Sequence, residues 1–144
     1  MTSPMYTDSV PVFKQSLTAL KAILAQADAH AAAISLEPDA FLQARLAGVG
    51  VPNYEGEERS FADLDGLLTR TLEFLDSVNS SQFEGSETKE IVLRPGTPKE
   101  KKLSGQAYLA NYGLPQFLFH VTTAYAILRH NGLAIGKRDY MGAY

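Results

Sequence analysis

Residues 119–132 have the sequence FHVTTAYAILRHNG, which predicts a helix in the core of the protein. The apolar residues on its main face, extended upstream, recur at spacings of three and four: Leu114, Phe117, Leu118, Val121, Tyr125 and Leu128. Phe119, Ala124 and Ile127 widen this face around the cylinder, which is typical of a central helix. Basic residues in the last turn suit the negative end of the helix dipole, and Gly132 suits the position after it.

The same kind of spacing predicts two further long helices. The first runs from about Ser9 to His30, with apolar residues from Val10 to Leu24 on one face. The other follows Ser60, which together with Asp63 has the pattern of a capping box, and it ends at residues 79–81. A short helix opened by Pro38 and an acidic loop at residues 53–59 are expected between them.

A small β-hairpin or irregular insert is predicted before the last helix. Residues 88–93 have the composition of a strand, residues 94–97 form a turn signal, and residues 99–103 can pair back. The helix that follows begins near Gln106, with a break or restart at residues 113–115. The tail from residue 133 to 144 has no periodicity and is expected to pack back on the helices. The predicted fold class is therefore mainly α, a helical bundle.

Length, charge and composition limit the classes of function. The chain has 144 residues, which fits a single domain over residues 1–144, and its net charge is −3 with no cysteine. The charge gives no general attraction to nucleic acid, and the Lys99–Lys102 run is better explained as an exposed hairpin arm. No apolar run reaches the length of a membrane span, and the start lacks a basic region followed by an apolar run. We therefore expect a cytoplasmic protein that binds neither nucleic acid nor membrane.

Three stretches of this sequence resemble a known family. They are Met5–Phe13, Phe41–Leu46 and the long C-terminal stretch from Leu114 to Asp139, which includes FHVTTAY and LRHNG. Together they resemble the DUF1993 family, a domain of unknown function within the DinB/YfiT-like superfamily. The resemblance covers nearly the whole chain and implies an up-down-down-up four-helix bundle, but it implies no reaction.

The chain departs from this family near residues 43–49. In relatives, an Ala-Arg-Leu stretch leads into a long second helix, and that helix ends in another Ala-Arg-Leu-Ala-Gly-Val. In this chain such a stretch occurs once, and Gln43 is followed directly by Ala-Arg-Leu-Ala-Gly up to Val49. The resemblance therefore predicts that a segment of roughly 27 residues, about the length of a helix that spans a bundle, is absent from this chain. A true deletion, a splice or gene-model difference, and residues left out of the sequence would each produce this junction. A bundle without one helix exposes apolar faces, so we expect a homo-oligomer, most simply a dimer.

The candidate site centres on His120. In the superfamily, three histidines commonly hold a divalent metal, and the resemblance makes His120 the one plausible ligand here. Ala124 occupies the position one turn later, His30 has no paired ligand, and His130 lies ten residues further along the helix. We therefore expect no bound metal or other cofactor.

Three tyrosines, Tyr108, Tyr112 and Tyr125, are candidates to line a pocket with His120. The alternative is that these aromatic side chains belong to the core and that His120 is buried, with a hydrogen bond to a tyrosine or a backbone carbonyl. The leading interpretation is a self-associating DinB-like protein without an assignable reaction. The alternative is a small-molecule enzyme, metal-dependent or with His120 as general acid or base, acting on a thiol or another small substrate that the sequence leaves unidentified.

Overall fold

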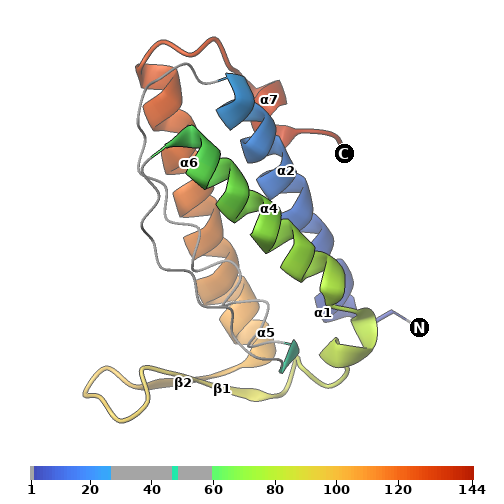
Figure 1. The fold of residues 1–144 in the computed structure, drawn as a ribbon. Coiled ribbons are helices and arrows are strands. Elements are labelled where there is room, and N and C mark those ends of the chain that lie inside the picture. The colour runs from blue at the N-terminus through green and yellow to red at the C-terminus, as the bar shows by residue number, and fades with distance from the viewer. Residues whose placement is uncertain (1, 27–46, 49–59) are drawn as a thin grey trace.

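The computed structural model describes residues 2–26, 47–48 and 60–144. Three helices of 17 residues each dominate this part of the chain: α2 (Val10–Gln26), α4 (Phe61–Ser77) and α6 (Leu114–His130). In Figure 1, α2 and α6 run upward and α4 runs downward, so α4 is antiparallel to both. The prediction of a mainly α fold is confirmed. The helix predicted after Pro38, the acidic loop and the end of the first helix lie outside the described residues.

One hydrophobic cluster joins these elements. Phe13 of α2 and Phe117 of α6 lie at its centre, with ring centroids 4.2 Å apart, and both side chains are fully buried. Leucines from α2 and α4 surround this pair with at most 1% of their surface exposed: Leu17, Leu20, Leu67 and Leu68. The apolar spacing in the sequence thus places the faces of three helices against one another.

Helix α4 begins at the predicted capping box. The backbone N–H of Asp63 donates to Ser60 Oγ at 3.1 Å, and the N–H of Ser60 donates to Asp63 Oδ2 at 3.0 Å. The helix ends at Ser77, and a 3-10 turn, η1 (Ser80–Phe83), follows. The hydroxyl of Ser80 accepts a hydrogen bond from the N–H of Ser3 at 2.8 Å, which fixes the short helix α1 (Pro4–Thr7) beside η1.

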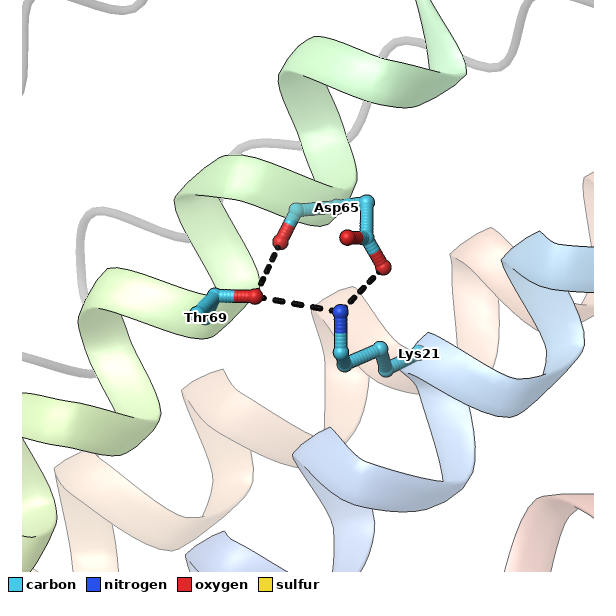
Figure 2. A network of polar contacts seen from close by, with 3 residues as sticks. All are labelled: Lys21, Asp65 and Thr69. Carbon is cyan, nitrogen blue, oxygen red and sulfur yellow. Dashed lines mark hydrogen bonds and ion pairs between the residues drawn. The ribbon is translucent and has the colours of Figure 1, made fainter.

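Two lysines of α2 form ion pairs with aspartates of α4. Lys14 pairs with Asp76, and Lys21 pairs with Asp65. Figure 2 shows that the Lys21 ammonium also donates to Thr69 Oγ1, at 3.0 Å, while that hydroxyl donates to the carbonyl of Asp65 at 2.9 Å. The side chains remain one-third to two-thirds exposed, so water screens both pairs and each contributes little to stability. Both pairs join α2 to α4 beside the apolar contact between the two helices.

The predicted hairpin is confirmed. Strand β1 (Glu90–Leu93) pairs antiparallel with β2 (Lys101–Ser104), with Ile91 opposite Leu103. It projects sideways from one end of the bundle in Figure 1. Its turn requires unusual backbone geometry, with φ of 51° at Arg94 and 73° at Gly96. The carboxylate of Glu100 accepts the N–H of Gly96 at 2.7 Å, which holds the tip in place.

The break predicted at residues 113–115 is not a break. Helix α5 (Gly105–Tyr108) continues through a π-helical turn, η2 (Leu109–Gly113), into α6, and the linking residues keep helical dihedral angles. Pro115 has no N–H to donate and lies in the first turn of α6, so the wider turn before it accommodates the ring without ending the helix. The result is one continuous helical rod with a local change of period.

The C-terminal tail packs back on the bundle, as expected, through helix α7 (Lys137–Met141). The side-chain amide of Gln15 in α2 donates to the carbonyl of Met141 at 2.9 Å. On the other side, the Tyr140 hydroxyl lies 3.0 Å from Thr122 Oγ1, and its ring meets the ring of Tyr125 edge-on. Helix α7 therefore connects α2 with one side of α6.

The close approach of two backbones at Gly105 gives a first prediction. A Cβ at this position would lie 1.7 Å from the carbonyl oxygen of Ser86, whereas a Cβ at Gly66, in the middle of α4, would meet no atom closer than 3.8 Å. We expect Gly105→Ala to lower the free energy of unfolding by about 1–3 kcal/mol because the loop must move. Gly66→Ala should raise it by about 0.5–1 kcal/mol, since alanine has less backbone freedom to lose. Urea unfolding followed by circular dichroism measures both, and equal effects would contradict the described packing.

A second prediction compares the aromatic contact with the ion pairs. Phe117→Ala removes a fully buried ring and should lower the free energy of unfolding by about 3–5 kcal/mol. Lys21→Met removes a half-exposed ion pair and should change it by less than about 1 kcal/mol. The same urea experiment measures both variants. A loss at Lys21 as large as that at Phe117 would show that the ion pairs, and not the aromatic core, hold the helices together.

Candidate functional site

His120 lies at the edge of the buried face of α6. Its neighbour Val121 is buried, while Phe119 on its other side is 66% exposed, so the imidazole is half-buried between them. The ring of Phe119 meets it edge-on, with centroids 5.5 Å apart. Within the described part of the chain, no hydrogen bond to the imidazole is formed. The structure therefore differs from the expected buried histidine that is hydrogen-bonded to a tyrosine or a carbonyl.

The three candidate tyrosines form two separate groups on the rod. Tyr108 is fully buried and stacks on Tyr112, with centroids 5.5 Å apart, in the segment before α6. Tyr125 lies five residues beyond His120, which turns it about 140° around the helix axis. Its hydroxyl is 3.5 Å from the carbonyl of Ile135, and its ring contacts Tyr140. Among the described residues, no hydrogen bond or ring contact joins His120 to any of the three.

Tyr140 is the residue that sequence reasoning missed. It lies in a tail without periodicity, where no spacing pattern connects it with α6. The signal that could have pointed to it is the Gly136-x-x-Asp139 pattern just before it, in which the N–H of Gly136 donates to Asp139 Oδ2 at 2.8 Å and starts α7. This capping interaction brings Tyr140 against Tyr125.

In the ranges that the structure describes, no group of three or more histidine, aspartate or glutamate side chains lies close enough to hold a metal ion. Ala124, one turn after His120, is buried in the core. His130 lies at the last residue of α6, and His30 is outside the described residues. None of the described helices is long and apolar enough to cross a membrane.

The exposed side of α6 carries no aspartate, glutamate, lysine or arginine before Arg129. Three large apolar side chains of α6 are exposed, Phe119 at 66%, Leu118 at 42% and Ile127 at 37%, and they are spread over about half of the helix circumference. No charged residue occurs from Leu114 to Leu128. The prediction that this helix is central is therefore correct for one side and wrong for the other, because helix neighbours cover the side of Phe117 and leave the side of Phe119 open.

The comparisons with known proteins agree with this fold. The model of the domain of unknown function DUF1993 matches residues 5–49 and 44–141. The chain belongs to the DUF1993 family. A solved structure of a DinB family member protein from Shewanella denitrificans is 28% identical to this chain. It matches with a TM-score of 0.85, over 96% of this chain and 92% of that chain, so the DUF1993 fold seen here is DinB-like. No curated protein matches the chain.

The DUF1993 match is divided where the sequence predicts a junction. Its two segments share residues 44–49. Such an overlap arises when two similar stretches flank a segment in the family and that segment is lost. The one stretch that remains then matches both. The overlap thus coincides with the Ala-Arg-Leu-Ala-Gly-Val stretch at which the second helix was predicted to be missing.

Proposed function

We propose that this DUF1993 protein acts as a cytoplasmic homodimer of helical bundles of the four-helix class, and that its outer α6 face is the surface that binds. The observation that carries this proposal is the exposure of Leu118, Phe119 and Ile127 on a helix with no charged residue before Arg129. The proposal depends on this exposed face and does not depend on the cause of the junction at residues 44–49.

An exposed face of this kind is costly unless a partner covers it. Contiguous apolar surface on a monomer marks binding sites, and the cores of protein interfaces are depleted of charge. By contrast, the exposed side of α4 carries Asp63, Arg70, Glu73 and Asp76. One helix face is smaller than the roughly 800 Å² per partner of a standard interface, so we expect a dissociation constant of about 1 μM or weaker.

A charge placed on this face tests the proposal. Phe119→Asp should shift the protein to a monomer across the micromolar range, because a desolvated carboxylate would have no partner there. Val12→Asp is the matched control, since Val12 is an apolar side chain of α2 that is 40% exposed. Sedimentation at several concentrations measures both variants, with circular dichroism to show that each is folded. A wild-type protein that remains monomeric at high concentration would overturn the proposal, as would dissociation caused by Val12→Asp alone.

A second candidate function is a small-molecule enzyme that uses His120. The observation in its favour is that His120 is only partly buried and that its ring nitrogens have no hydrogen-bond partner in the described ranges. A histidine in such a position can transfer protons near neutral pH. Within this superfamily, the resemblance suggests a thiol or another small substrate.

Metal content distinguishes this candidate from the first. If His120 ligates a catalytic metal, purified protein should contain zinc, nickel or iron near one equivalent, and His120→Gln should lose it. His130→Gln is the matched control, because His130 is an exposed histidine of the same helix. Elemental analysis by mass spectrometry gives the result. Metal that stays bound in His120→Gln, or no metal in protein dialysed against zinc, would remove the metal-dependent form of this candidate.

A further inference from the structure

The β-hairpin carries a concentration of positive charge at its outer end. We call residues 94–102 the basic arm, which runs from the end of β1 through the turn into β2 and projects from one end of the bundle in Figure 1. All nine of its residues are exposed. Four cations and one carboxylate give the basic arm a net charge of +3, in a chain whose net charge is −3. The cations are Arg94, Lys99, Lys101 and Lys102.

Most of this charge is not neutralised within the protein. Lys102 Nζ lies 3.4 Å from Glu90 Oε1, and both side chains are about three-fifths exposed, so this pair is weak. The other three cations of the basic arm form no ion pair with any described residue. They are Arg94, Lys99 and Lys101. The outer end of the hairpin therefore offers unpaired positive charge to a partner.

Hydrogen bonds within the turn hold the basic arm in one conformation. The carbonyl of Arg94 accepts from the N–H of Thr97 at 3.3 Å and from its hydroxyl at 2.9 Å. The carboxylate of Glu100 accepts from the N–H of Gly96, so the one acidic group of the arm is bound to its own backbone. Two prolines further restrict the backbone. A segment that is ordered before it binds loses little conformational entropy when a partner arrives.

Strand β2 also has an open edge. It pairs with β1 on one side, and these two strands are the whole of the described sheet. In an antiparallel pair, every second residue of a strand turns its N–H and C=O away from the neighbouring strand. Among the described residues, the backbone of Lys101, Lys102 and Leu103 forms no hydrogen bond outside the hairpin. An extended segment can therefore add to β2 as a third strand.

The charge of the basic arm selects an acidic protein segment for this edge. Lysines on an edge strand discourage pairing with apolar or basic strands, whereas opposite charges on neighbouring strands stabilise the pair. A carboxylate on the added strand would thus lie beside Lys101. The basic arm has no aromatic side chain on which a nucleic-acid base could stack, and the acidic remainder of the chain repels a long phosphate backbone.

We propose that the basic arm binds an extended acidic segment of another protein, which adds to the outer edge of β2 as a third strand. The backbone of that segment bonds to β2, and its carboxylates pair with Lys101 and with Lys99 at the end of the turn. This inference goes beyond the proposed dimer and does not depend on it, because the basic arm and α6 are different elements.

A short fluorescent peptide of alternating glutamate and threonine is the probe, and fluorescence anisotropy at low ionic strength measures its binding to the full chain. Lys99→Gln combined with Lys101→Gln should weaken the binding about five- to tenfold, because two ion pairs at an exposed site are lost. Lys137→Gln combined with Arg138→Gln is the matched control, since these are two exposed cations of α7, and it should leave the binding unchanged. Circular dichroism shows that both variants are folded.

A second peptide separates strand addition from attraction by charge alone. Proline in place of each threonine keeps every carboxylate but removes the N–H groups that a third strand needs, so binding should fall about fivefold or more. Equal binding of the two peptides would overturn the added strand. An equal loss in the α7 control, or no binding by the wild-type protein, would overturn the site on the basic arm. Duplex DNA that binds more tightly than the acidic peptide at the same salt concentration would replace the protein partner by a nucleic acid.

Discussion

The contact between Phe13 and Phe117 decides how α6 is oriented, and most of the structure depends on that orientation. With the two rings 4.2 Å apart, one side of α6 turns inward, and Val121, Ala124 and Leu128 follow it into the core. An α-helix repeats every 3.6 residues, so fixing one side fixes the other. The residues opposite Phe117 must then face away from α2, however apolar they are.

The elements with strong local signals could be predicted from the sequence. The capping box of Ser60 and Asp63 depends on two side chains three residues apart, and the hairpin depends on a turn that needs Gly96 in a left-handed conformation. Both are short-range interactions that a sequence pattern specifies fully. The π-helical turn before α6 was not predicted, because glycine and proline at residues 113–115 ordinarily signal an interruption. Here the rod stays helical, and Leu109 in the π-helical turn and Phe117 after it are both buried in the core.

The candidate site was harder to predict, because it depends on rotation about a helix axis. Apolar residues on one side of a helix predict which side is buried. The apolar residues of α6 extend over nearly all sides, so the buried side depends on which helices pack against it. His120 therefore lies at the boundary of the core, and Tyr125 turns to Tyr140, which belongs to a segment without any periodic signal. Spacing along one helix cannot show which tyrosines meet a given histidine when the partner comes from another element.

The two candidate functions make different demands on the same helix. Proton transfer by His120 requires a second polar group within hydrogen-bond reach and a site from which water is excluded. Among the described residues, the imidazole contacts the ring of Phe119 and no polar group. Association requires exposed apolar area without charge, and Leu118, Phe119 and Ile127 supply it. Burial of apolar surface contributes about 25 cal/mol per Å², so covering these side chains would stabilise an association, and the outer side of α6 is the stronger indication of function. Covering Phe119 would also reduce the access of water to His120, because the two rings are in edge-on contact.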